Sequence, residues 1–129
     1  MTSPIDRMKA HFILYVADQR ESTAFYRAVL GVEPELDVPG MTEFRLGPDA
    51  VLGLMPVAGA SRLLGRELEP NCEPRAEVYL LVDDPEAYHR RALAAGASEV
   101  SRLGLRDWGH VAAYSIDPSG HVLAFARDA

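Results

Sequence analysis

Two side chains that can bind metal ions or transfer protons occupy equivalent places in this chain. His11 opens the apolar run HFILYV, and Glu77 opens the run EVYLLV, 66 residues later. An imidazole or carboxylate at the start of a strand can ligate a metal, contact a bound molecule, or form a hydrogen-bonded pair inside a core. The two residues alone leave these three alternatives open.

An internal repeat makes the two positions equivalent. VAD (residues 16–18) follows the first apolar run, and VDD (82–84) follows the second at the same offset of 66. Later in each half, AVLGLMPV (50–57) resembles HVLAFARD (121–128), and each follows a turn rich in Gly, Pro and Asp. Since the order of elements is the same in both halves, we predict two copies of strand–helix–strand–strand–strand.

Local signals mark the helix of each copy. Asp18 and Asp84 are suited to cap a helix, because a side-chain oxygen there can accept a hydrogen bond from an amide of the first turn. Pro85 suits the first helical position. Gly31 and Gly96 are suited to the left-handed conformation that ends a helix. The helices are therefore predicted to begin after each aspartate and to end before each glycine.

These signals predict an α+β fold of two βαβββ modules, with a curved mixed sheet inside and helices outside. We predict one domain that spans residues 1–129. Within it, module 1 covers about 8–57, a linker covers about 58–75 and module 2 covers about 76–129. The stretch 56–75 is predicted to carry a helical turn near 61–68, a mobile flap, or both. The predicted strands are 11–16, 41–46, 50–55, 76–82, 110–116 and 121–126, with shorter ones near 35–38 and 98–102.

Side chains alternate across a strand, so each predicted strand has two faces. In the first strand, Phe12, Leu14 and Val16 are assigned to the helix-packed core. The opposite face mixes His, Glu, Tyr and small residues, which is typical of a concave ligand surface. The side chains predicted to share this second face are His11, Ile13, Tyr15, Gly53, Met55, Glu77, Tyr79 and Ala124. Trp108 is predicted to form an aromatic wall at the mouth of the cup, or alternatively to pack in the core or a dimer interface, whereas His89 and His121 are predicted to face solvent.

Composition excludes several classes of protein. The 129-residue chain carries a formal net charge of −6 and shows no cluster of Lys and Arg, so no nucleic-acid partner is expected. Cys72 is the single cysteine, which fits a reducing compartment. No apolar run is long enough to span a bilayer, and residues 1–10 lack the apolar region of a signal peptide. We therefore expect a soluble, cytoplasmic protein without a membrane partner.

Two stretches of the sequence resemble the vicinal oxygen chelate superfamily, which includes glyoxalase I, bleomycin-resistance proteins and extradiol dioxygenases. HFILYVADQRESTAFYRAVLG (11–31) is similar to the opening of that family, and SIDPSGHVLAFAR (115–127) is similar to its closing turn and strand. The resemblance covers nearly the whole chain and implies the fold predicted above. It also implies a homodimer, often with modules exchanged between subunits.

The resemblance further implies where a metal ion would bind. Metal-dependent members place one ligand, usually His or Glu, at each of four positions that are held here by His11, Gly53, Glu77 and Ala124. His11 and Glu77 are therefore the implied ligands of a divalent ion such as Ni, Zn, Mn or Fe. Gly53 and Ala124 have no donor atom in their side chains, so this ligand set is incomplete unless His110 or His121 supplies a third ligand.

Three functions remain from the sequence. The first is a small-molecule-binding protein of the bleomycin-resistance type, without a required cofactor, which holds a partly aromatic or cationic molecule in the cup. The second is a metal-dependent lyase or dioxygenase of the glyoxalase type that uses His11 and Glu77. The third is a metal-free isomerase with Glu77 as the catalytic base. The ligand-binding residues predicted for the first function are His11, Ile13, Tyr15, Gly53, Met55, Tyr79, Trp108 and Ala124.

Overall fold

The structure is a computed structural model that describes residues 9–68 and 76–129. These residues form two compact units. Unit 1 contains the described residues 9–23 and 32–68, and unit 2 contains 24–31 and 76–129.

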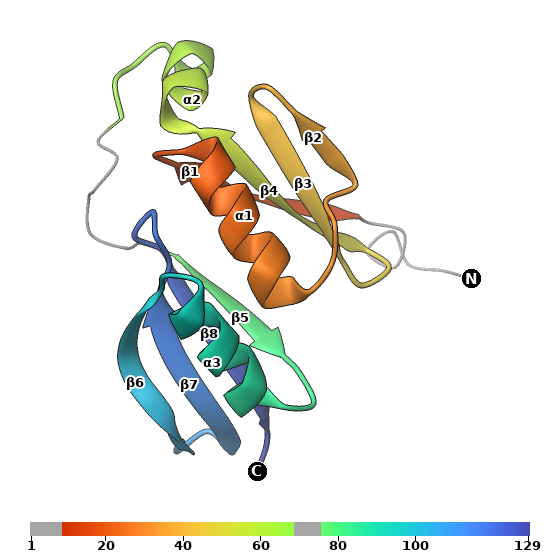
Figure 1. Ribbon diagram of the computed structural model, residues 1–129, viewed down its shortest axis with the longest axis vertical. Coiled ribbons are helices and arrows are strands. Elements are labelled where there is room, and N and C mark those ends of the chain that lie inside the picture. The colour runs from red at the N-terminus through yellow and green to blue at the C-terminus, as the bar shows by residue number, and fades with distance from the viewer. Residues whose placement is uncertain (1–8, 69–75) are drawn as a thin grey trace. The chain divides into compact units, whose positions relative to one another are not determined.

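Unit 1 is built on the four-stranded sheet of the first module. In this sheet the strand order is β1-β4-β3-β2, with β1 parallel to β4 and the other pairs antiparallel (Figure 1). The elements of the first module are β1 (Ala10–Val16), α1 (Gln19–Leu30), β2 (Leu36–Val38), β3 (Met41–Leu46), β4 (Ala50–Pro56) and α2 (Val57–Leu64). Helix α1 begins in unit 1 and ends in unit 2.

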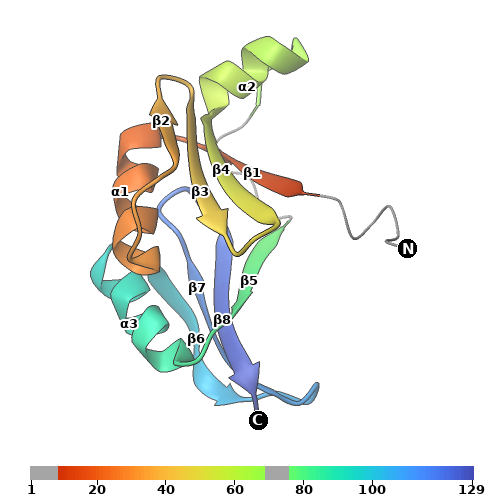
Figure 2. The same cartoon turned by 90° about the vertical axis from the view of Figure 1, so that its right-hand side faces the viewer.

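Unit 2 contains the sheet of the second module. Its order, β5-β8-β7-β6, repeats that of unit 1, with β5 parallel to β8 and the other pairs antiparallel. Helix α3 lies on one face of this sheet (Figure 2). The elements are β5 (Glu77–Leu81), α3 (Pro85–Ala94), β6 (Ser98–Leu105), β7 (His110–Ile116) and β8 (Val122–Asp128). The predicted α+β fold of two βαβββ modules is confirmed, and each module forms its own four-stranded mixed sheet.

The predicted helix caps are also present. The backbone N–H of Glu21 donates to Asp18 Oδ1 at 3.0 Å, and the N–H of Ala87 donates to Asp84 Oδ1 at 3.1 Å. Gly31 follows the end of α1 with a φ of +71°, a left-handed conformation that a side chain would disfavour. These short-range interactions explain why the helix ends could be predicted from local sequence.

The core face of unit 1 follows the predicted alternation with one exception. Leu14 and Val16 are buried on the same face as Leu52 and Phe44 of the neighbouring strands. Phe12 was assigned to this core, but it is 62% exposed, so that assignment is wrong. Phe12 lies near the start of β1, which is an edge strand. Its side chain therefore has a neighbouring strand of the same sheet on one side only.

A chain of hydroxyl groups joins the start of α1 to the β2–β3 hairpin in unit 1. Thr23 Oγ1 and Thr42 Oγ1 are 2.8 Å apart and both side chains are buried. Gln19 Nε2 donates to Thr42 Oγ1 at 3.0 Å and to the carbonyl of Val38 at 2.8 Å. The helix therefore meets the sheet through satisfied polar groups as well as through apolar contacts.

Histidines in unit 2 differ from the prediction. His89 was expected to face solvent, but it is 5% exposed, and its Nε2 lies 2.9 Å from Glu99 Oε2. His121 is partly buried, and its Nδ1 lies 3.1 Å from Asp117 Oδ2. Both side chains turn inward because a carboxylate of the same unit provides a hydrogen-bond partner.

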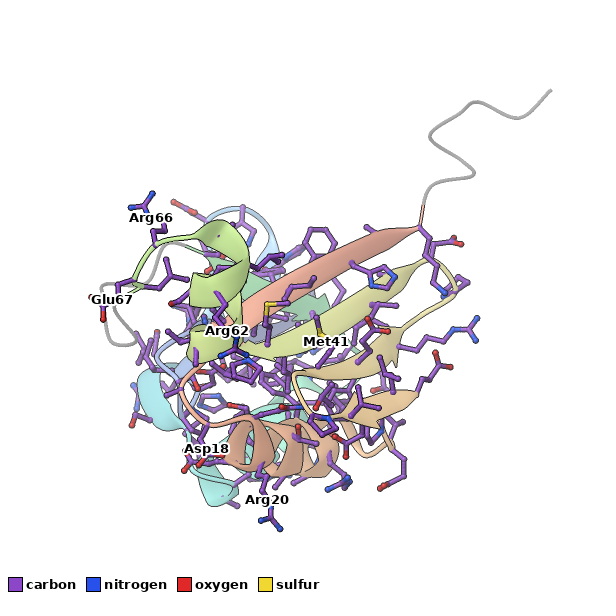
Figure 3. The ribbon with its side chains drawn as sticks, turned by 90° about the horizontal axis from the view of Figure 1, so that it is seen from above. Asp18, Arg20, Met41, Arg62, Arg66 and Glu67 are labelled. Carbon is purple, nitrogen blue, oxygen red and sulfur yellow. The ribbon has the colours of Figure 1, made fainter. Side chains whose placement is uncertain are left out.

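Part of the predicted linker is helical. Helix α2 starts directly after β4 and ends at Gly65, which has a φ of +69°, so the helix lies earlier than the turn predicted near 61–68. Arg66 and Glu67 lie beyond the C-terminal end of α2, while Asp18 and Arg20 lie at the start of α1 (Figure 3). Residues 69–75, including Cys72, are outside the described residues. In the described parts, every helix is too short or too polar to cross a membrane.

Candidate functional site

Five of the predicted ligand-binding residues share one face of the unit 1 sheet. Ile13 lies opposite Gly53 and Tyr15 lies opposite Met55 in the β1–β4 register. Residues opposite one another in paired strands point to the same side, so His11 joins this face through its neighbour Val51. Ile13 and Tyr15 are exposed there. The structure thus brings His11, Ile13, Tyr15, Gly53 and Met55 to one surface.

His11 has a carboxylate partner in its own unit that the sequence did not predict. His11 Nδ1 lies 3.5 Å from Glu43 Oε2. Glu43 is on β3 and lies opposite Gly53 of β4, whereas His11 is on β1, so the carboxylate reaches across the intervening strand.

A Cβ atom at Gly53 would lie 3.0 Å from Ile13 Cγ1 and 3.4 Å from Met41 Sδ. The missing side chain at Gly53 therefore allows close packing of its neighbours.

The corresponding face of the unit 2 sheet carries aromatic and charged side chains. Tyr79 of β5 lies opposite Ala124 of β8, which lies opposite Tyr114 of β7. Glu77 precedes Tyr79 by two residues and shares its side of β5. His110 joins the same side at the start of β7. We call Glu77, Tyr79, Trp108, His110 and Tyr114 the aromatic face, and Trp108 is included because its indole is hydrogen-bonded to Tyr79.

Hydrogen bonds hold three rings of the aromatic face together. Trp108 Nε1 donates to Tyr79 Oη at 3.1 Å, and Tyr79 Oη lies 2.6 Å from His110 Nδ1. The rings of Tyr79 and His110 are stacked, with centroids 5.8 Å apart and an interplanar angle of 28°. His110 Nε2 lies 3.4 Å from Asp128 Oδ1. The Trp108 side chain nevertheless stays 54% exposed, so an indole fixed at one edge is open to a ligand.

Arg106 braces the hairpin that carries Trp108. Its Nη2 donates to the carbonyls of Ala112 at 2.7 Å and Arg102 at 2.9 Å, and to Ser101 Oγ at 3.0 Å. The guanidinium also lies over the ring of Tyr114, 5.2 Å from its centroid. Since these bonds occupy the guanidinium, Arg106 acts in the structure as a support for the β6–β7 hairpin.

The pKa of Tyr114 responds to the charged groups around the aromatic face. Partial burial raises the pKa of the Tyr114 hydroxyl, the charges of Glu77 and Tyr79 raise it further, and Arg106 lowers it. The net direction is upward, so the hydroxyl stays protonated at neutral pH. The negative charge of Glu77 therefore acts on Tyr114 within the aromatic face.

The donor atoms within each unit are too few for a typical catalytic metal centre. Among residues 9–68 and 76–129, no three or more His, Cys, Asp or Glu side chains are placed to hold an ion. Unit 1 offers the pair His11 and Glu43. Unit 2 offers three pairs: His110 with Asp128, His89 with Glu99 and His121 with Asp117. Catalytic zinc usually has three protein ligands, so none of these pairs fits such an ion. The pairing of His11 with Glu77 joins the two units and stays a prediction.

Sequence reasoning missed several residues of these surfaces. Glu43 could have been found only by knowing which strand lies across β4 from β1. His110 opens a predicted strand just as His11 does and was named as an alternative third metal ligand, but its contact with Tyr79 was not predicted. Asp128 sits close to the end of the chain, where no pattern marked it. The predicted residues Glu77, Tyr79, Trp108 and Ala124 do lie in the unit that contains the aromatic face.

The chain belongs to the glyoxalase/bleomycin resistance protein/dioxygenase superfamily, whose sequence pattern matches residues 9–125. The predicted family is therefore confirmed. No curated protein matches the chain.

Solved structures with the same fold come from several bacteria. A glyoxalase-related enzyme from Fulvimarina pelagi is 20% identical with a TM-score of 0.85, covering 95% of this chain and 88% of that one. A glyoxalase/bleomycin resistance protein/dioxygenase family enzyme from Burkholderia phytofirmans PsJN is 18% identical with a TM-score of 0.80, covering 92% and 97%. A glyoxalase/bleomycin resistance protein/dioxygenase from Nocardioides is 20% identical with a TM-score of 0.76, covering 99% and 85%. At these identities the similarity establishes the fold.

Proposed function

We propose that this chain is a small-molecule-binding protein of the glyoxalase/bleomycin-resistance type, which holds a planar, partly aromatic or cationic molecule against the aromatic face. The observation that carries this proposal is the hydrogen-bonded set of Trp108, Tyr79 and His110, in which the indole is fixed and still exposed. A held aromatic surface suits binding, because little side-chain freedom is lost when a ligand stacks on it.

Charge supports the same class of ligand. Glu77 lies on the aromatic face. Burial has the largest effect on the pKa of Tyr114, and the Glu77 carboxylate raises this pKa further. Rings next to a carboxylate favour a cation, since the negative faces of the rings and the carboxylate act in the same direction. The net charge of −6 of the whole chain favours approach of a positively charged molecule.

The unit 1 face is a second surface on which we propose ligand contacts. Ile13 and Tyr15 are exposed apolar and aromatic surface beside Gly53 and Met55. His11, with Glu43 at 3.5 Å, adds a polar pair to that surface. Such a mixture of apolar area and a few polar groups is typical of ligand sites.

Intrinsic fluorescence tests the proposed function. Trp108 is the only tryptophan in the chain, so its emission reports directly on the aromatic face. We expect saturable quenching or a spectral shift on titration with planar aromatic compounds and aromatic amines. Tyr88→Phe is the control, because Tyr88 packs on Phe125 and Arg91, away from the proposed site. The proposal is contradicted if no compound of the panel causes a saturable change. It is also contradicted if Tyr88→Phe loses the binding that the wild-type protein shows.

The proposed protein is a cytoplasmic homodimer, with modules exchanged between subunits as the family resemblance implies. The support within each unit is that β1 and β5 stand at one edge of their sheets, where a strand can gain a further partner. Light scattering coupled to size-exclusion chromatography tests the assembly. A mass of twice 14.1 kDa supports it, and a mass of 14.1 kDa contradicts it.

A further inference from the structure

We infer that the molecule bound on the aromatic face presents an N–H or O–H donor to Tyr79 Oη. This inference rests on the proposed function and specifies the chemistry of its ligand. It follows from the hydrogen-bonding capacity of the three groups that meet at this oxygen: the indole of Trp108, the phenol of Tyr79 and the imidazole of His110.

The indole of Trp108 is a hydrogen-bond donor to Tyr79. An indole Nε1–H can donate but cannot accept, so its contact of 3.1 Å occupies a lone pair of Tyr79 Oη. A phenol oxygen has one proton and two lone pairs. One lone pair and the proton then remain for other partners.

The imidazole of His110 is the second partner of Tyr79. Its Nε2 faces the carboxylate of Asp128 at 3.4 Å, and an ionised carboxylate can only accept hydrogen bonds. This partner favours the tautomer with the proton on Nε2, because the partner of one ring nitrogen sets the state of the other. Nδ1 is then an acceptor, and the contact of 2.6 Å is a hydrogen bond donated by Tyr79.

The Tyr79 hydroxyl keeps one lone pair for a ligand. Its proton is given to His110, and one lone pair accepts from Trp108. Within residues 9–68 and 76–129, these are the two hydrogen bonds of this hydroxyl. The remaining lone pair can only accept, and the carboxylate of Glu77, two residues earlier on the same side of β5, is also an acceptor. The surface therefore matches a planar aromatic molecule that carries an N–H group, such as an azole or an aromatic amine.

Three probes of nearly equal shape test the inference: indole, 1-methylindole and benzofuran. Indole has the N–H, 1-methylindole has a methyl group in its place, and benzofuran has an oxygen acceptor. The readout is the ¹H–¹⁵N NMR signal of the Trp108 indole, which is unique in the chain. Loss of one hydrogen bond predicts binding about two- to tenfold weaker for benzofuran and 1-methylindole than for indole.

Tyr79→Phe is the matched variant, because it keeps the ring and removes the acceptor oxygen. In this variant the preference for indole over benzofuran should disappear, while benzofuran should still bind. Long-range ¹H–¹⁵N spectra of His110 should show the tautomer protonated on Nε2.

The outcomes separate the two proposals. If all three probes shift the Trp108 signal with equal affinity, or if His110 is protonated on Nδ1 alone, the inference is overturned and the proposed function stands. A preference for indole that persists in Tyr79→Phe also overturns the inference. If no probe shifts the signal, the aromatic face does not bind rings, and both proposals fail.

Discussion

The hydroxyl oxygen of Tyr26 lies 2.6 Å from Asp117 Oδ2, across 91 residues of sequence. Tyr26 is in the part of α1 that belongs to unit 2, and Asp117 begins the DPSG turn between β7 and β8. Both side chains are buried. Asp117 Oδ1 also accepts from the backbone N–H groups of Ser119 and His121, each at 2.9 Å. A single carboxylate thus fixes a helix and a turn.

Removal of the Tyr26 hydroxyl should destabilise the protein, although the phenyl ring still fills the same space. Tyr26→Phe loses a hydrogen bond to a charged acceptor and leaves the buried Asp117 oxygen without its donor. Such bonds contribute about 1.5–3 kcal/mol, so we expect the free energy of unfolding to fall by about 2 kcal/mol. Urea denaturation measures it. Tyr15→Phe, at an exposed ring, should change it by less than about 0.5 kcal/mol. Equal values for the two variants contradict this account.

The stability of the wild-type protein should depend on Asp117 in acid. Burial raises the pKa of the Asp117 carboxyl, but hydrogen bonds from His121 and Tyr26 outweigh this effect, so the pKa lies below its ordinary value. A carboxyl with a lowered folded-state pKa stabilises the fold above its unfolded pKa of about 3.9. That contribution is lost as the pH falls through the folded-state pKa.

Asp117→Asn, which cannot titrate, should therefore differ most from wild type near neutral pH. We expect the difference in the free energy of unfolding to be constant above about pH 5 and to narrow below about pH 4. Urea titrations at several pH values give this difference. A gap that stays constant or widens in acid shows that the charge of Asp117 is not what stabilises the turn.

Arg106→Ala should loosen the hairpin that carries Trp108. The guanidinium donates to two carbonyls and a hydroxyl of the β6–β7 region, and the alanine variant removes these hydrogen bonds. We expect stronger acrylamide quenching of Trp108 and a loss of stability of about 1–2 kcal/mol. Arg102→Ala is the control, because the contact there uses the backbone carbonyl of Arg102. Identical quenching in both variants rules out the bracing role of Arg106.

The donor count predicts weak retention of divalent metals. Within residues 9–68 and 76–129, histidine and carboxylate donors come together in pairs: His11 with Glu43, His110 with Asp128, His89 with Glu99 and His121 with Asp117. Two ligands are fewer than the usual set, so after incubation with Ni²⁺, Zn²⁺, Mn²⁺ or Fe²⁺ and desalting, we expect well under one ion per chain. Elemental analysis of wild type and His11→Ala measures this. Close to one ion per wild-type chain, lost in His11→Ala, favours the metal-dependent lyase or dioxygenase over the binding protein.

Much of the fold could be predicted because its determinants are local. Asp18 and Asp84 cap their helices through bonds to amides three residues away, and Gly31 ends a helix through its own φ. The strand boundaries followed from alternation and turn residues. The repeat then predicted the topology. Two halves with the same order of elements form two four-stranded sheets with equivalent strand orders.

The errors concern interactions between residues that are far apart in sequence. Burial of His89 depends on Glu99 of β6, and exposure of Phe12 depends on the place of β1 at the edge of its sheet. The partner of His11 lies on β3, on the far side of β4. Alternation shows which residues share a face of one strand, but it does not show which side chain reaches across a neighbouring strand.

Isothermal titration calorimetry on wild type and Trp108→Ala most directly tests the claim that the aromatic face binds a small molecule. The ligand is the best planar aromatic compound from the fluorescence titrations. We predict at least about tenfold weaker binding to Trp108→Ala, because a stacked ring and its buried area are lost. Leu63→Ala removes an apolar side chain of α2 that is 73% exposed and should bind as wild type does. Equal affinity of wild type and Trp108→Ala would contradict the central claim.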